Sequence, residues 1–450
     1  LCEIMLRDSA HIQMFEAEWR NRKAARSGGK LKEFVPLYDM DAAVNVCKQF
    51  VGCEYDRVYD IAEGIKIRFT DVGHLLGSAS IEVWATEKTE NGDVTEKIVF
   101  SGDIGNINKP IIKDPKHVRD ADYVVMESTY GNRSHGGTPN YVEDLTDIFK
   151  RTFERGGNVV IPSFAVGRTQ ELLYIIRKIK EDNLVGRDFD VYMDSPLAIE
   201  ATNIFVKNVE SCFDDEAVEL VRKGINPLSF PGLKYATTGD ESKQINFDPN
   251  PKVIISSSGM CEAGRIRHHL KHNLWRPECT IVFVGYQAVG TTGRIIVDGA
   301  EEIKLFGEPI QIKAEIVQLK GSSGHADKDG LLCWINAFDT KPKKVFVVHG
   351  EDSVCDEFTE CLKEEYGYDA MAPYTGGSYD LIADRVISEG VKERKTRRTT
   401  STQRGKTVFD RLVAAGKRLM TVITHNEGGT NKDLAKFTDQ INALCDKWDR

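Results

Sequence analysis

Short apolar runs that end in glycine-containing polar turns recur along this sequence of 450 residues. These runs have the length and the β-branched content of buried strands. Longer segments with helical periodicity lie between them, for example residues 140–155 and the stretch that begins near Arg168. Strands that alternate with helices in this way predict an α/β architecture with parallel strands. The main predicted strands are 65–70, 98–100, 121–127, 157–162, 190–194, 252–256, 280–285, 316–319 and 344–348.

Both ends of the chain show amphipathic helical patterns. Residues 1–26 predict a helix with one apolar face, and we interpret His11 within it as a structural residue. A second short helix is expected at residues 40–50. Near the other end, residues 408–419 and 434–448 carry apolar side chains at helical spacing. These two helices could form a hairpin, pack on the main domain, or join two copies of the chain as a homodimer.

Composition is that of a globular protein, with 41% hydrophobic residues and a formal net charge of −9. No apolar run approaches the length of a membrane span, and no secretory signal opens the chain, so we expect no membrane contact. The ten cysteines are scattered without a CxxC pair, which favours a reducing, cytoplasmic location over a disulfide framework. The negative net charge does not indicate nucleic-acid binding, but it leaves a local basic groove open.

Five side chains with metal or acid–base chemistry follow predicted strands. His74, Asp103, His325 and His349 each lie beside glycine, and Glu127 ends a strand. One such turn is more often ordinary packing. Five at strand ends predict a converging site, because strand termini on one edge of a sheet gather in space. Histidine together with aspartate suits a metal such as zinc.

Two serine-containing turns before helices could hold an anion. Ser163 and Arg168 open one helix, and the Ser258-Gly259 turn with Arg265 opens another. Free amides and the helix dipole favour negative charge at such positions. Ordinary helix capping explains the same residues about equally well. The histidines of the second helix, at 268, 269 and 272, lack a carboxylate or cysteine at a matching spacing and are not expected to bind a metal.

Eight motifs in a fixed order over residues 70–351 resemble the β-CASP branch of the metallo-β-lactamase-fold nucleases, which includes nucleases of messenger-RNA 3′-end cleavage and bacterial and archaeal relatives. The motifs are GHLLGSAS, FSGDIG, MESTYGNR, PSFAVGRTQELLY, SSGMCEAGRIRHHLKH, FVGYQAVGTTG, GSSGHAD and VVHGE. The resemblance implies a four-layered αββα hydrolase domain into which a parallel α/β β-CASP domain is inserted. It implies an endo- or 5′-exoribonuclease that uses two zinc ions and acts on RNA, with single-stranded RNA as the expected substrate.

The resemblance also implies roles for individual residues. His74 would bind the first zinc, His349 the second, and Asp103 would bridge both while taking part in catalysis. His325 would act as general acid or phosphate contact, with Glu127 orienting it. The implied substrate-phosphate contacts are Ser163, Arg168, Ser258, Gly259 and Arg265. Alternatives are a DNA-directed or small-molecule hydrolase of the same fold, or an inactive RNA-binding or scaffold subunit.

The sequence departs from the family in one respect. The His-x-His-x-Asp-His run that supplies four of the family's zinc ligands is absent from residues 1–450. Its place in the family lies upstream of the helix that opens this chain, and the first residue is Leu1, so we expect an N-terminally truncated sequence. We therefore expect weak or no binding of two zincs and little activity from the chain as given.

These features predict five regions. The first part of the hydrolase domain is expected at 1–138, the inserted β-CASP domain at 139–305 and the second hydrolase part at 306–385. A basic linker at 386–406 could touch RNA backbone or be merely solvated, and C-terminal helices follow at 407–450.

Overall fold

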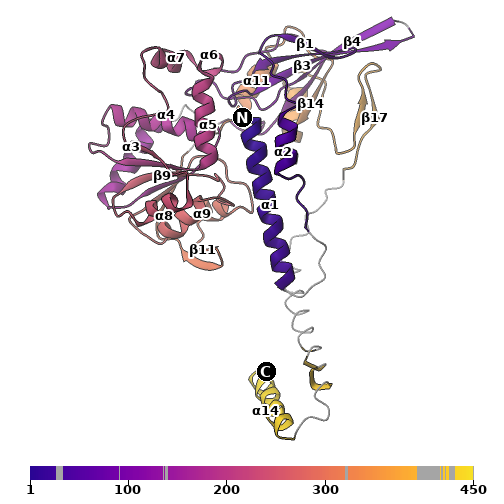
Figure 1. Ribbon diagram of the computed structural model, residues 1–450. Coiled ribbons are helices and arrows are strands. Elements are labelled where there is room, and N and C mark those ends of the chain that lie inside the picture. The colour runs from indigo at the N-terminus through magenta and orange to yellow at the C-terminus, as the bar shows by residue number, and fades with distance from the viewer. Residues whose placement is uncertain are drawn as a thin grey trace. The chain divides into compact units, whose positions relative to one another are not determined.

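The structure, a computed structural model, describes residues 1–26, 34–90, 92–134, 136, 140–319, 323–392, 416, 419–420, 422–424 and 431–448. The chain forms two compact units: Leu1–Pro373 with Gly377–Glu389, and Tyr374–Gly376 with Gly390–Arg450. The first unit contains both large sheets (Figure 1). Among the helices of the described residues, none combines the length and the apolar character needed to cross a bilayer.

The hydrolase part is built on a seven-stranded mixed sheet in the order β1-β2-β3-β4-β5-β14-β15. Strands β1 to β4 pair antiparallel, and β4, β5, β14 and β15 pair parallel. Its strands are β1 Val58–Ala62, β2 Ile65–Asp71, β3 Ala79–Thr89, β4 Gly92–Phe100, β5 Tyr123–Glu127, β14 Lys344–Val348 and β15 Ala370–Met371. Its helices are α1 Cys2–Arg26, α2 Met40–Cys47, α11 Lys328–Ile335 and α12 Asp352–Glu364. A separate hairpin joins β16 Ser378–Asp380 to β17 Arg385–Ser388.

The inserted domain is a six-stranded sheet in which every pairing is parallel, in the order β13-β10-β6-β9-β7-β8. Its strands are β6 Val159–Pro162, β7 Asp190–Asp194, β8 Leu233–Tyr235, β9 Lys252–Ser256, β10 Thr280–Phe283 and β13 Glu315–Gln318. Its helices are α3 Tyr141–Glu154, α4 Arg168–Glu181, α5 Pro196–Lys207, α6 Val209–Cys212, α7 Asp215–Arg222, α8 Gly239–Phe247, α9 Ile266–Asn273 and α10 Thr292–Val297, with a β-hairpin of β11 Glu302–Leu305 and β12 Glu308–Gln311.

Side chains of the central strands in the inserted sheet point alternately to its two faces, and each face packs against its own apolar cluster. In β6, Val159 and Ile161 belong to the apolar cluster that includes α3 and α4, whereas Val160 faces the cluster that includes α9. Strands covered on both faces must be apolar throughout, which explains the continuous runs in the sequence. The first cluster also contains Ile111 and Ile112 of the hydrolase part, so the two domains share a continuous core.

The fold confirms the predicted α/β class with an inserted parallel domain. Strand β13, which lies in the predicted second hydrolase part, pairs with β10 in the inserted sheet. The linker does not begin at residue 386, because β17 continues to Ser388. Within the described residues the hydrolase part has one large sheet, where the αββα sandwich implied by the resemblance has two.

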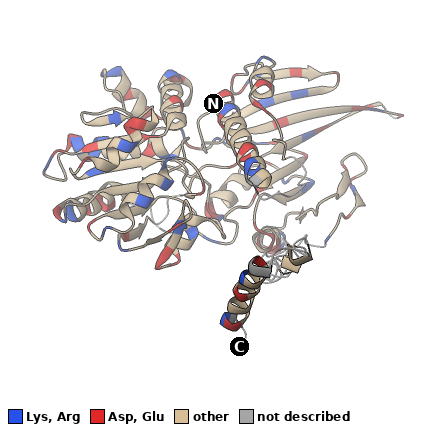
Figure 2. Ribbon diagram, turned by 60° about the horizontal axis from the view of Figure 1, so that its bottom comes forward, with Lys and Arg blue, Asp and Glu red and all other residues tan. Residues whose placement is uncertain are grey.

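In the second unit, the helix α14 Asn431–Trp448 confirms the helical pattern predicted for 434–448. The pattern predicted at 408–419 and most of the basic linker lie outside the described residues. Figure 2 shows positions of Lys and Arg interspersed with positions of Asp and Glu along α14 and over the helices of the inserted domain. The distribution of charge along these helices therefore does not by itself mark a path for a polyanion.

Candidate metal centre

Four of the predicted site residues meet because four strands run in the same direction. Strands β2 and β4 are both antiparallel to β3, and β4, β5 and β14 are parallel to one another. Their carboxyl ends therefore lie on one edge of the sheet. His74 and Asp103 follow β2 and β4 by three residues, Glu127 is the last residue of β5, and His349 is the first after β14.

His325 reaches the same place by a different route. The strand that precedes it, β13, belongs to the inserted sheet, so the prediction that His325 follows a strand of the shared edge is wrong. An isolated antiparallel bridge pairs His325 with Gly105, and the Ala326 amide donates to the Ile104 carbonyl at 2.7 Å. This bridge holds His325 beside the turn that carries Asp103.

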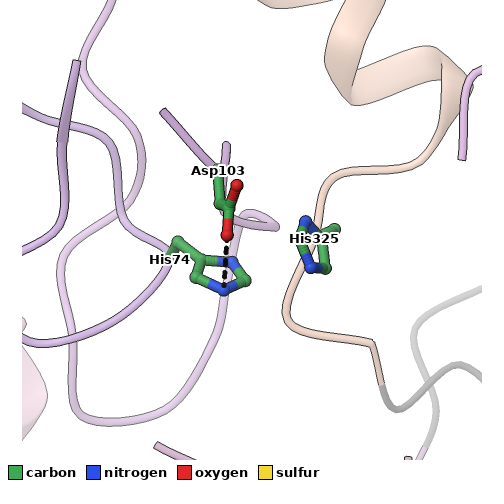
Figure 3. Close-up of side chains that lie close together, drawn as sticks. All are labelled: His74, Asp103 and His325. Atoms are coloured by element: carbon green, nitrogen blue, oxygen red, sulfur yellow. Dashed lines mark ion pairs between the residues drawn. The ribbon is translucent and has the colours of Figure 1, made fainter. Parts of the chain in front are cut away.

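The Asp103 carboxylate lies between two histidines. Its Oδ2 is 3.9 Å from Nε2 of His74, and its Oδ1 is 3.5 Å from Nδ1 of His349. Figure 3 shows Asp103 pointing at the His74 ring, with His325 facing them from another loop. One carboxylate with each oxygen directed at a different imidazole has the arrangement needed to bridge two cations.

His74 is buried in a way that keeps it neutral. Burial, followed by the neighbouring His325 and Lys109, lowers the pKa of His74 to about 4. Its Nδ1 is buried without a hydrogen-bond partner among the described residues, and the His74 and His325 ring centroids are 4.4 Å apart. A neutral imidazole that faces a carboxylate is suited to bind a metal, because only the neutral ring offers a nitrogen lone pair.

The buried Glu127 and the partly exposed His325 form an acid–base pair. Nδ1 of His325 is 3.0 Å from Oε2 of Glu127, whose side chain is almost fully buried and also accepts the Ile104 amide. Burial opposes ionisation of Glu127, but hydrogen bonds from His325 and His349 outweigh it and hold its pKa at about 2. Glu127 is thus an anion that fixes the orientation of the His325 ring.

His349 is the exposed member of the site. Its side chain is 56% exposed, its backbone has φ +53°, and Thr129 Oγ1 lies 3.2 Å from its Nδ1. Hydrogen bonding to Glu127, and then the charges of Asp103 and Glu127, raise the pKa of His349. Two groups of potential ligand atoms overlap here, namely His74, Asp103 and His325, and Glu127, His325 and His349. We place Glu127 outside the ligand set, because its oxygens are already engaged by Ile104 and His325.

The predicted phosphate contacts are engaged within their own turns. Ser163 is buried and accepts from Thr169 Oγ1 at 3.0 Å, and Arg168 pairs with Glu171 at 2.6 Å. Ser258 Oγ accepts the Glu262 amide at 3.2 Å, next to Gly259. Arg265 bonds to Asp194 at 2.7 Å and to the carbonyls of residues 236 and 237. These contacts explain the local structure, and a role in phosphate binding stays a prediction for all five residues.

Sequence reasoning missed Lys109, which links the centre to the inserted domain. Its Nζ donates to the His74 carbonyl at 2.9 Å and pairs with Glu171 Oε1 on α4 at 3.0 Å. Arg168 holds the other oxygen of Glu171. Burial disfavours the Glu171 anion, but Arg168 and Lys109 outweigh this and lower its pKa to about 2. The only available signal was that Lys109 lies six residues beyond Asp103 in the same turn region.

Histidines on either side of a carboxylate at strand ends, beside an inserted parallel domain, are an arrangement typical of metal-dependent hydrolases. Comparison with known families makes this specific: residues 169–296 match the Beta-Casp domain, and residues 309–373 match the Zn-dependent metallo-hydrolase RNA specificity domain. These two matches support the resemblance to the β-CASP family of metallo-β-lactamase-fold nucleases that the ordered motifs indicated.

Named relatives agree with this placement. The chain is 35% identical to Ribonuclease TTHA0252 of Thermus thermophilus over 64% of this chain and 63% of that protein. It is 35% identical to an RNase J-like protein of Methanocaldococcus jannaschii over 65% of each chain. It is 32% identical to Transcription termination factor FttA of Methanosarcina mazei over 78% of this chain and 54% of that protein. In each case the match spans less than two thirds of the relative's length.

Proposed function

We propose that this chain carries the reaction centre of a zinc-dependent hydrolase that cleaves phosphodiester bonds in RNA. The observation that carries the proposal is the placement of Asp103 between His74 and His349, with His325 held by Glu127 beside them. The match to an RNA specificity domain and the names of two ribonuclease relatives support RNA as the substrate.

Three side chains of this chain would hold zinc. His74 offers a neutral imidazole, His349 an exposed one, and Asp103 has one oxygen toward each, which supports two ions rather than one. When bound, zinc lowers the pKa of coordinated water and offsets the charge of a phosphodiester. The hydrogen bond to Glu127 and the charge of Asp103 raise the pKa of His349, so protons compete with zinc for this imidazole.

His325 is placed to move a proton. Glu127 engages its Nδ1, which fixes the ring and leaves Nε2 for the substrate. A histidine oriented by an anion can donate a proton from Nε2 to the leaving oxygen when the phosphodiester bond breaks. Glu127 orients the ring and so acts through His325 rather than on the substrate.

A second candidate is an RNA-binding subunit without cleavage. The observation in its favour is that no His-x-His-x-Asp-His run occurs in the sequence, so His74, Asp103 and His349 are the members of the implied zinc ligand set that this chain supplies. On this reading the inserted domain retains RNA binding while the metal centre is incomplete. The scattered cysteines, all ten of them free, support a reducing cytoplasmic location for either candidate.

Cleavage and binding measured side by side test the proposal. The chain is mixed with a labelled single-stranded RNA and with DNA of the same sequence, with added zinc or with a chelator. Because the His-x-His-x-Asp-His run is absent from this sequence, we expect at most weak zinc-dependent cleavage of RNA, which the chelator abolishes and which Asp103→Asn lacks. RNA binding with no cleavage at any zinc concentration would support the second candidate. Equal cleavage of DNA would contradict RNA as the substrate class.

A further inference from the structure

Two aromatic side chains are exposed at the carboxyl edge of the inserted sheet. Phe164 follows β6 by two residues and is 45% exposed, and Tyr286 follows β10 by three residues and is 42% exposed. Strands β6 and β10 are parallel neighbours. Both rings therefore emerge at the same edge of the sheet, which is where ligands bind in open parallel α/β folds.

The backbone around Phe164 is shaped to hold its ring. A Cβ added to Gly259 would lie 3.0 Å from Cδ2 and 3.1 Å from Cε2 of Phe164, and one added to Gly285 would lie 3.9 Å from Cε2. The ring thus rests on two glycine backbones. Gln287, which is buried, donates Nε2 to the Gly259 carbonyl at 3.0 Å and to the Gly285 carbonyl at 3.3 Å. These bonds tie the turns after β9 and β10 into a rigid support.

The same two aromatics connect to both sides of the metal centre. Gly167, three residues beyond Phe164, packs against the side chain of Leu75, the neighbour of His74. The Tyr286 hydroxyl lies 3.5 Å from Oε1 of Glu351, two residues beyond His349. The segments that carry the two exposed aromatics therefore contact the segments that carry His74 and His349.

We propose that Phe164 and Tyr286 form a stacking platform for unpaired nucleobases of the strand that is cleaved. The inference rests on the proposed function, which supplies an RNA strand as the substrate. It adds a site that binds the bases of that strand rather than its phosphates. A flat aromatic face suits any base, because every base has a π face. Glu351 beside Tyr286 disfavours a phosphate at this point, whereas a neutral base meets no charge penalty there. The platform requires a strand whose bases are unpaired near the site.

An abasic oligonucleotide separates stacking from phosphate contacts. The full chain is titrated with a short fluorescent single-stranded RNA and with the same RNA carrying abasic residues, in chelator to prevent cleavage and at fixed salt. We expect the unmodified chain to bind the intact RNA about tenfold or more tighter than the abasic one. Phe164→Ala and Tyr286→Ala should each reduce this ratio toward one while leaving affinity for the abasic RNA unchanged.

Matched variants keep the test specific. Phe164→Trp should retain the ratio, because it keeps an aromatic face. Phe247→Ala, which removes a ring that is 70% exposed on α8, should not change it. The platform is overturned if the unmodified chain binds both RNAs equally, or if Phe164→Ala keeps the full preference for the intact RNA. Binding of neither RNA would overturn the RNA substrate of the proposed function and the platform with it.

Discussion

Three histidines at one centre take different chemical roles because their surroundings differ. His74 is buried and neutral, with a pKa of about 4. His349 is exposed and faces Glu127 and Asp103, which raise its pKa. His325 is fixed through Nδ1 by the buried Glu127 anion. At the scale of single residues, burial and neighbouring charge therefore distinguish the two proposed metal ligands, His74 and His349, from His325, the proposed proton donor.

This separation predicts different defects for two substitutions. His325→Ala should reduce the cleavage rate about 10²- to 10⁴-fold, the usual contribution of a general acid, with zinc content unchanged. His74→Ala should instead lower zinc content, because it removes a ligand. Rates from single-turnover cleavage and zinc per chain from elemental mass spectrometry distinguish the two. His11→Ala in α1 is the control and should change neither quantity. Loss of zinc in His325→Ala would show that His325 is itself a ligand.

The low pKa of Glu171 predicts a pH-dependent stability. Its folded-state pKa of about 2 lies below its ordinary value of 4.5, so its contribution is fully present above about pH 4.5 and is lost as the pH falls toward 2. Glu171→Gln should lower the free energy of unfolding by about 3 kcal/mol at pH 7. The difference from the unmodified chain should shrink as the pH falls below 4.5. Urea unfolding at several pH values measures this difference in the free energy of unfolding. A difference that does not change with pH would contradict the ion-pair explanation.

At the scale of elements, the segment between β4 and β5 joins the two domains. Lys109 reaches Glu171 on α4 and the His74 carbonyl, and Lys113 donates to the Ser211 carbonyl of α6 at 2.8 Å. Ile112 forms an isolated bridge with Phe213. The loop that carries Asp103, a proposed metal ligand, is thereby held against the inserted domain, although the hydrolase part and the inserted domain have separate sheets.

Lys109 and Lys113 provide a matched pair of variants. Lys109→Met should weaken zinc binding about tenfold or more, because groups that orient metal ligands typically contribute this much. Lys113→Met removes a contact between the same segments without touching His74, and it should leave zinc affinity unchanged. Competition with a chromogenic chelator gives the affinities. An equal loss in both variants would indicate general loosening of the interface rather than positioning of His74.

At the scale of the whole molecule, the chain is two compact units of unequal size. The first holds both sheets and the whole candidate metal centre, and the second holds α14. The centre draws on segments from His74 to His349, and the residues that position it belong to the first unit. Each unit makes most of its contacts within itself, so we expect the first to be stable without the second.

Deletion of residues 390–450 tests this expectation. The shortened chain should unfold at an unchanged temperature and keep its zinc affinity, because its core is intact. RNA binding should weaken and become less dependent on salt, because seven basic residues at 392–406 are removed. Thermal unfolding and anisotropy at several salt concentrations measure both effects. A large drop in the unfolding temperature would show that the second unit stabilises the first, and light scattering would show whether it joins two copies.

Local sequence was enough to predict the strands that precede four of the site residues and several of the helices. Apolar runs ending in glycine turns located β2, β4, β5 and β14, and the shared direction of those strands brings His74, Asp103, Glu127 and His349 together. The ordered motifs identified the family, because each is a contiguous stretch of the chain. These features depend on residues that are neighbours in the sequence, so the sequence alone is sufficient to predict them.

Only the tertiary structure decided the features that depend on distant pairs. The runs at 316–319 and 344–348 look alike in sequence, yet β13 pairs with β10 in the inserted sheet and β14 pairs with β5 in the other. Arg168 resembles a free phosphate ligand in sequence, but Glu171 engages it and also holds Lys109. Strand partners and buried ion pairs are set by packing between segments far apart in the chain, and no local pattern specifies which segments will meet.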